Sequence, residues 1–283
     1  MPQSDYLPTT ITLYRDNAKK NYSVQVIGET TFTPHWLVKA CHARGWTYAT
    51  PSYRLLPEAT GLEILSDACD AVQWLSKNIS DRIVIAGSSA GGYLALAASS
   101  HIVRPRPLAV LSVYGVLDFA SKRYIESGQP LLGPVKDLPE ALEEVNAAMN
   151  SSHVLDGYAF PQDPSTDQRF RWICALHQAA RYPDVLTRIP GLAGRIATEG
   201  VSAIPEQYRP LFPASFGLKL DLPPTVLLHG NADVMVEFSQ SASVAEKMEA
   251  LGIKVHLECA EGQGHGFDAR SDIDLDKEDT EQD

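Results

Sequence analysis

Three side chains in this sequence, Ser89, Asp233 and His265, are of the types that together activate a serine hydroxyl for attack on a carbonyl carbon. A serine hydroxyl is a weak nucleophile at neutral pH and needs a base within hydrogen-bond reach. A histidine can take the hydroxyl proton and return it to a leaving group, and a buried carboxylate holds the imidazole in the required tautomer. The order serine, acid, histidine along the chain is that of one known triad lineage. We therefore expect acyl-transfer chemistry at Ser89.

The serine lies in the segment Gly87-Ser88-Ser89-Ala90-Gly91-Gly92, between two apolar stretches. The stretch 82–86 predicts a strand, and the stretch 93–98 predicts a helix. A strand, a G-x-S-x-G turn and a helix form the context of a nucleophile elbow, in which glycines leave room for a sharp bend. We expect the backbone N–H of Ala90 to donate to the developing oxyanion at the positive end of this helix.

The acid and the histidine each follow a predicted strand. Asp233 ends the run 227–233, and His265 lies in the glycine-rich loop 261–267. Functional side chains of an open α/β sheet gather beyond the carboxyl ends of its strands. Taken singly, the serine could be a turn residue, the aspartate a helix cap and the histidine a solvated loop residue. Their order and placement together favour a triad.

The sequence offers little for a metal or a cofactor, and we expect neither. It contains no H-x-x-x-H, H-E-x-x-H or C-x-x-C pair. The four cysteines are widely spaced and are expected to be free buried thiols: Cys41, Cys69, Cys174 and Cys259. The other histidines lack the loop context of His265. Among them His229, in the strand ahead of Asp233, is expected to be packed structure.

The alternation of predicted elements indicates an α/β fold with a mostly parallel sheet and helices on both faces. We expect strands at 10–14, 22–27, 46–53, 82–86, 108–114, 225–229 and 254–258, and helices at 34–44, 61–75 and 238–251. The span 116–222 is rich in proline, glycine and short helical patterns, such as 140–149 and 168–180. We divide the chain into an α/β core (1–115 and 223–267), a helical cap insert (116–222) and an acidic tail (268–283).

Composition and charge narrow the class of partner. The 283 residues are 44% hydrophobic and 21% charged, which is ordinary for a soluble globular protein. The net charge of −11 argues against a nucleic-acid partner. In the tail, eight acidic residues oppose Arg270 and Lys277, so we expect a disordered end. The sequence has no recognisable signal peptide or membrane span. We expect a cytoplasmic protein that acts on a small-molecule ester or acyl substrate.

Four segments carry a family resemblance: Tyr53-Arg54-Leu55-Leu56-Pro57-Glu58, the elbow Gly87–Gly92, His229–Asp233 and Gly264–Phe267. They resemble motifs of the α/β-hydrolase superfamily, and within it of the hormone-sensitive-lipase-like carboxylesterases, although Ser88 stands where that group usually has aspartate. The resemblance covers about Pro34 to Phe267. It implies an α/β-hydrolase fold with a helical cap over the site. It also implies that Ser89 is the nucleophile, Asp233 the orienting acid and His265 the base.

One segment of that family pattern is missing. Family members have a strand that ends in His-Gly-Gly-Gly, whose glycine N–H groups complete the oxyanion hole. Here the region 22–34 contains only Gly28. This glycine could offer a single N–H donor, or it could be a turn after a strand, the interpretation that we favour. The region is also short, so either a central strand is absent or the strand at 22–27 takes its place. Loss of one oxyanion donor costs roughly a hundred- to a thousand-fold in turnover.

Several functions fit these motifs. The leading hypothesis is a serine hydrolase that cleaves a carboxylic ester of a small or medium apolar substrate through an acyl-enzyme. An alternative keeps the fold but catalyses cyclisation, a lyase step or acyl transfer, for example in a natural-product pathway. A ligand-binding protein and a truncated inactive homologue are further alternatives. Four aromatic residues of the insert are either pocket walls or the core of the cap: Phe160, Phe170, Trp172 and Phe212.

Overall fold

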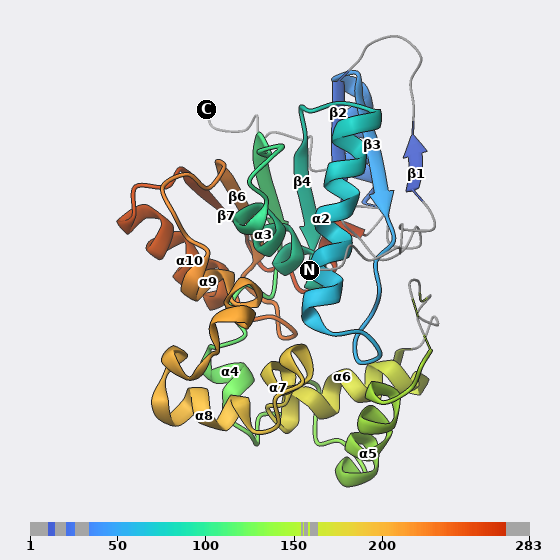
Figure 1. The fold of residues 1–283 in the computed structure, drawn as a ribbon, viewed down its shortest axis with the longest axis vertical. Helices are drawn as coiled ribbons and strands as arrows, with labels where there is room; N and C mark the ends of the chain where they lie inside the picture. Colours follow the sequence, from blue (N-terminus) through green and yellow to red (C-terminus); the bar gives the residue numbers. More distant parts are fainter. Residues whose placement is uncertain are drawn as a thin grey trace.

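The computed structural model describes residues 11–14, 21–25, 34–153, 155, 158 and 164–269. Within these residues the strands form one seven-stranded sheet in the order β1-β3-β2-β4-β5-β6-β7 (Figure 1). The strands are β1 Ile11–Tyr14, β2 Asn21–Gln25, β3 Trp46–Pro51, β4 Val84–Ser88, β5 Ala109–Val113, β6 Thr225–Gly230 and β7 Val255–Ala260. The α/β fold class expected from the sequence is thereby confirmed.

The N-terminal strands decide how the sheet is completed. β1 pairs with β3 in antiparallel register, whereas each of the remaining neighbouring pairs is parallel. β2 lies between β3 and β4, with Val24 opposite both Ala49 and Ile85. Of the two alternatives for the short N-terminal region, the second therefore holds, because β2 occupies a central position. Gly28 lies outside the described residues.

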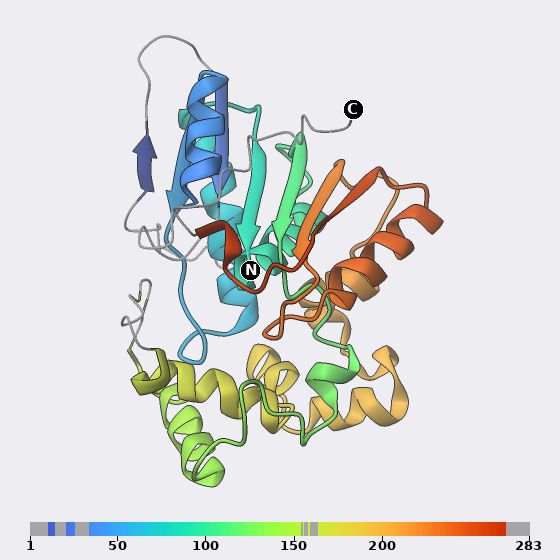
Figure 2. The ribbon, with the colours of Figure 1, turned by 180° about the vertical axis from the view of Figure 1, so that it is seen from behind.

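Helices cover both faces of the sheet. The α-helices are α1 His35–Ala43, α2 Gly61–Asn78, α3 Ala90–His101, α4 Lys122–Ile125, α5 Leu138–Met149, α6 Gln168–Gln178, α7 Tyr182–Thr187, α8 Leu192–Glu199, α9 Pro213–Phe216 and α10 Ser239–Ala250. The 3₁₀ turns are η2 Pro164–Thr166, η3 Val201–Ala203, η4 Glu206–Leu211 and η5 Phe267–Ala269. Helices α2 and α3 lie in front of the strands in Figure 1, and α1 lies on the opposite face (Figure 2).

Alternating side chains of β5 pack into hydrophobic clusters on opposite faces of the sheet. Val110 belongs to the large cluster with α2 and α3, whereas Leu111 and Val113 pack in the cluster around Tyr114 and Phe267 on the α1 side. This two-residue period is that of a strand buried on both faces. The carboxyl end of β5 therefore links the two layers of the core beside the elbow.

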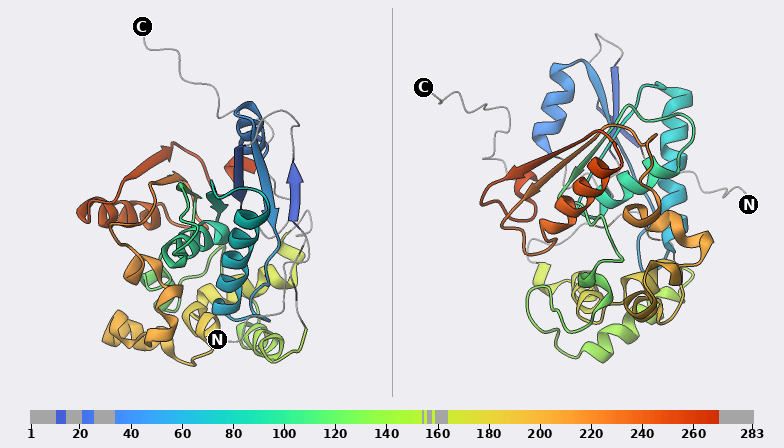
Figure 3. Two further views of the ribbon diagram at one scale, coloured as in Figure 1. Left: turned by 45° about the horizontal axis from the view of Figure 1, so that its top comes forward. Right: turned by 90° about the vertical axis from the view of Figure 1, so that its left-hand side faces the viewer.

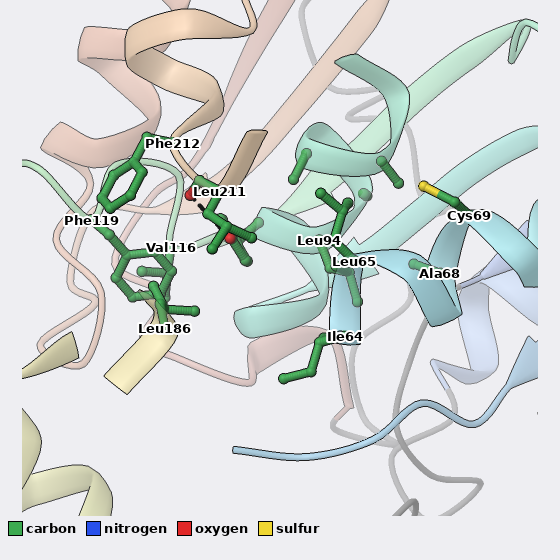
Figure 4. Close-up of a cluster of buried hydrophobic side chains, with 14 of the residues drawn as sticks. Ile64, Leu65, Ala68, Cys69, Leu94, Val116, Phe119, Leu186, Leu211 and Phe212 are labelled. Atoms are coloured by element: carbon green, nitrogen blue, oxygen red, sulfur yellow. Dashed lines mark hydrogen bonds between the residues drawn. The ribbon is translucent and has the colours of Figure 1, made fainter. Parts of the chain in front are cut away.

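The segment 116–222, which we call the insert, holds helices α4 to α9, and its described residues contain no strand. Helices α4 to α8 gather beyond the carboxyl ends of the central strands (Figure 1 and Figure 3). Apolar burial holds the insert to the core: Leu186 and Leu211 share a cluster with Leu65 of α2 and Leu94 of α3 (Figure 4). The insert thus lies at the sheet edge where the predicted site residues end their strands.

Charged contacts strengthen this attachment. Arg169 of α6 donates to both oxygens of Glu58, at 2.7 and 3.0 Å, and both side chains are largely buried. Arg188, after α7, donates to the Pro57 carbonyl at 2.6 Å. The Tyr53–Glu58 segment therefore ties the core to the insert. Of the four aromatic residues considered for the insert, Trp172 and Phe212 are buried in hydrophobic clusters, Phe170 is half-buried and Phe160 lies outside the described residues.

The boundary predicted for the acidic tail, 268–283, lies too early in the chain, because the fold includes Asp268 and Ala269. Asp268 is only 5% exposed, and η5 extends to Ala269. The carboxylate is buried because Tyr114 and Trp36 each donate a hydrogen bond to it. The folded core therefore continues past Phe267, and residues 270–283 lie outside the described residues. Among the described helices, none is both long and apolar enough to cross a bilayer.

Candidate active site

Ser89 lies at a sharp bend between β4 and α3, with φ 54° and ψ −120°. This left-handed conformation is unfavourable for a residue with a Cβ, and residues that adopt it are found mainly at functional sites. The Ser89 N–H donates to the Val113 carbonyl at 2.9 Å, which fixes the bend against β5. A Cβ at Gly87 would lie 2.2 Å from the Gly91 carbonyl oxygen, and one at Gly92 would lie 2.7 Å from the Gly115 Cα. Close backbone approach therefore requires both glycines.

Asp233 is held by the loop that follows β6. Its Oδ1 accepts hydrogen bonds from the backbone N–H groups of Met235 and Val236, at 2.8 and 3.0 Å. Asp233 thus accepts hydrogen bonds from its own loop, and it does not cap helix α10, which was the alternative considered for a lone aspartate. The remaining oxygen, Oδ2, points to His265. The Asp233 side chain is fully buried.

His265 bridges the acid and the serine. Its Nδ1 lies 2.7 Å from Asp233 Oδ2, and its Nε2 lies 3.0 Å from Ser89 Oγ. Because an ionised carboxylate only accepts, Nδ1 carries the proton and Nε2 is left to accept from the serine hydroxyl. The structure thus brings the three side chains together, although His265 lies 176 residues from Ser89 and 32 residues from Asp233 along the chain.

The electrostatics keep the acid ionised. Burial acts to raise the pKa of Asp233, but hydrogen bonds from His229, His265 and the Val236 N–H outweigh it and hold that pKa well below its usual range. An ionised Asp233 can stabilise the imidazolium that forms when His265 takes the serine proton. The arrangement therefore suits a proton transfer from Ser89 at neutral pH.

His229 is buried, as expected, and it also contacts the acid. Its Nε2 lies 2.9 Å from the Val236 carbonyl oxygen and 3.4 Å from Asp233 Oδ2. Since a carbonyl only accepts, Nε2 carries a proton, and Nδ1 pairs with the Ser241 hydroxyl at 2.8 Å. His229 therefore supports the Asp233 loop from behind.

Sequence reasoning missed Tyr114. Its ring packs on the His265 imidazole, with centroids 4.5 Å apart and planes at 53°. A signal was available, because Tyr114 follows strand β5 directly, as Asp233 follows the run of β6. The apolar pattern of the sequence predicts only that Tyr114 is the last residue of a strand.

The structure describes one of the two candidate oxyanion donors, Ala90. Ala90 is the first residue of α3, and a first-turn N–H has no partner within its own helix. Ala90 is exposed and Ser89 half-buried, so a substrate carbonyl can reach both. Gly28, the other candidate donor, lies outside the described residues. In the part of the chain that the structure describes, no three His, Cys, Asp or Glu side chains are grouped to hold a metal.

Comparison with known proteins agrees with this architecture. A family model described as alpha/beta hydrolase fold matches residues 24–162. A Staphylococcus aureus protein of unknown function superimposes with a TM-score of 0.64 at 18% identity, over 92% of this chain and 87% of that one. Esterase B from Lactobacillus rhamnosis gives 0.57 at 19% identity, over 94% and 77% of the two chains. Esterase Est2 from Thermogutta terrifontis gives 0.52 at 18% identity, over 91% and 78%.

The curated relatives are much longer proteins. Non-reducing polyketide synthase Preu3 from Preussia isomera is 26% identical, over 83% of this chain but 10% of its own length. Methylphloroacetophenone synthase from Cladonia uncialis is 25% identical, over 80% of this chain and 10% of its own length. The chain thus spans about a tenth of the length of these relatives. Together with the strand–Ser89–helix bend and the parallel sheet, the family match shows that this chain belongs to the α/β-hydrolase superfamily.

Proposed function

We propose that this protein is a serine hydrolase that cleaves a carboxylic ester of a small or medium apolar substrate through an acyl-enzyme. The observation that carries the proposal is the pair of hydrogen bonds that His265 makes, to Ser89 Oγ at 3.0 Å and to Asp233 Oδ2 at 2.7 Å. These distances lie within the range for a nucleophile, a general base and an orienting acid that act together.

Each step follows from this geometry. His265 Nε2 takes the hydroxyl proton while Ser89 Oγ attacks the ester carbonyl carbon, and the Ala90 N–H donates to the resulting oxyanion. The imidazolium then protonates the leaving alcohol as the tetrahedral intermediate collapses to the acyl-enzyme. A water molecule, deprotonated by His265, releases the acid and restores Ser89. Gly28 is our candidate for a second oxyanion donor.

The test is covalent labelling of Ser89. The purified full chain is treated with a fluorophosphonate probe, and the labelled residue is located by mass spectrometry. We expect one adduct, on Ser89, and hydrolysis of p-nitrophenyl esters of short acyl chains that Ser89→Ala abolishes. Ser100→Ala is the matched control, because Ser100 lies on helix α3, which begins directly after Ser89, and its hydroxyl donates to the Ala97 carbonyl. A folded protein with neither label nor hydrolysis overturns the proposal.

A second candidate function is acyl transfer or cyclisation in a natural-product pathway. It is favoured by the match of most of this chain to a segment of proteins named as non-reducing polyketide synthases. The same Ser89 would accept an acyl chain, and a hydroxyl or enol carbon of the substrate would replace water in the second step. Incubation with acyl N-acetylcysteamine thioesters separates the two functions. Free acid as the product supports hydrolysis, whereas a cyclised or transferred product supports the second candidate.

A further inference from the structure

We propose that Asp268 is a positioning residue for His265, acting through Tyr114. The inference rests on the proposed function, in which His265 is the general base. It concerns the face of the imidazole, whereas Asp233 holds the Nδ1 edge.

Asp268 is a buried carboxylate with two donors from distant parts of the chain. The Tyr114 hydroxyl donates a hydrogen bond to Oδ1, and Trp36 Nε1 donates to Oδ2 at 3.3 Å. A carboxylate that is 5% exposed is expensive to bury without such partners. Burial, with the neighbouring Asp268 charge, raises the pKa of Tyr114 far above its usual range, so its hydroxyl remains a donor. The carboxylate thus joins helix α1 and the residue that follows strand β5 to the turn that follows His265.

Tyr114 is held in an unfavourable backbone conformation. Its φ is +40°, in the left-handed region that a residue with a Cβ rarely adopts. Its N–H donates to the Leu228 carbonyl at 2.7 Å, and its hydroxyl is bound by Asp268. Such a conformation persists only where the surrounding contacts determine it. The bond to Asp268 is therefore one of the interactions that keep the ring in place.

The ring of Tyr114 forms a wall for the imidazole. The centroid of the Tyr114 ring lies 4.5 Å from that of the His265 ring. Phe267 packs edge-on against the Tyr114 ring, with centroids 5.6 Å apart. Without the bond to Asp268, the strained backbone can relax and the ring can withdraw. His265 then loses its support on that face, and its Nε2 moves relative to Ser89. A displacement of about 1 Å between reacting groups costs on the order of a hundred-fold in rate.

The experiment measures the rate of Ser89 labelling by a fluorophosphonate in full-length variants between pH 6 and 9. We expect Asp268→Ala and Tyr114→Phe each to slow labelling by about ten- to a hundred-fold. Because both variants remove the same hydrogen bond between Tyr114 and Asp268, the double variant is expected to be no slower than Asp268→Ala. Asp268→Asn keeps an acceptor for the tyrosine hydroxyl and should label within a few-fold of the native rate. Asp221→Ala removes an exposed carboxylate and is the matched control.

A second measurement does not depend on reactivity. The His265 ring protons of histidine-labelled protein sense the ring current of Tyr114, so their NMR shifts should change in Asp268→Ala and stay near native in Asp268→Asn. If the native protein is not labelled but these shifts change as expected, the proposed function fails and the positioning role stands. If the native protein is labelled and Asp268→Ala matches it in rate and shifts, the positioning role is wrong. Should Asp268→Ala not fold, Tyr114→Phe, which keeps the carboxylate and its bond to Trp36, decides in the same way.

Discussion

Replacement of Gly87 by alanine tests whether the bend at Ser89 depends on close backbone approach. A Cβ at Gly87 would lie 2.2 Å from the Gly91 carbonyl oxygen and 2.3 Å from its carbonyl carbon, whereas ordinary contacts begin near 3.4 Å. Both atoms belong to the backbone, so no side chain can turn away. The first turn of α3 must therefore withdraw from β4 by about 1 Å, the scale on which misplaced reacting groups lose rate.

Ser89 and Ala90 lie between the two glycines and must move with them. The hydrogen bond from Ser89 Oγ to His265 Nε2, now 3.0 Å, would lengthen beyond the range of a hydrogen bond. We expect the labelling rate of Ser89 to fall by roughly a hundred-fold. The overpacked elbow should also lower the free energy of unfolding by about 1–3 kcal/mol.

The assay compares the fluorophosphonate labelling rates and the urea unfolding curves of the native protein and the Gly87→Ala variant. Gly194→Ala is the matched control, because a Cβ at this helical glycine of α8 meets no atom within 4 Å. That control should label at the native rate and gain up to about 1 kcal/mol of stability. A folded Gly87→Ala protein that labels within about three-fold of the native rate would refute the argument from close approach, since the loss expected is far larger.

Three further predictions concern titratable groups. Asp233→Asn keeps the shape of the acid but offers a donor to His265 Nδ1, so we expect the rate of ester hydrolysis to fall by about 10⁴-fold, measured by steady-state kinetics. Because the pKa of Asp233 is lowered in the folded protein, its ionised form stabilises the fold above the unfolded-state pKa of about 3.9, and that stability is lost as the pH falls below this value. Urea unfolding at pH 7 and pH 3 should therefore show a smaller loss for Asp233→Asn than for the native protein, and an equal loss would contradict the assignment. Burial raises the pKa of the Cys69 thiol to about 12, so Cys69 should resist a thiol-specific disulfide reagent at pH 8 and react only in urea, as mass mapping would show.

The elements of the fold were largely predictable, because their signals are local. The helix expected at 238–251 is α10, Ser239–Ala250, and the strand expected at 225–229 is β6, Thr225–Gly230. Apolar residues with a period near two or near 3.6 mark a buried strand or a helix face within a few residues of chain. The strand before the elbow was expected at 82–86 and lies at Val84–Ser88, since it continues into the bend.

The order of the strands was not predictable in the same way. The position of β2 between β3 and β4 depends on backbone pairing with residues more than twenty and sixty positions away, such as Ala49 and Ile85. A short apolar stretch predicts a strand but carries no record of its neighbours. Only the assembled sheet resolved whether the central strand was missing or replaced.

By itself the sequence determined the kinds of group at the site and their order along the chain: a serine in a glycine turn, an acid and a histidine, each at the end of a strand. The tertiary structure decided their distances and the groups around them. Asp268 shows the difference. Its acidic surroundings in the sequence predict a solvated tail, but donors 154 and 232 residues away, on Tyr114 and Trp36, draw it into the interior. Burial of a charge depends on partners in space, and the chain order does not reveal them.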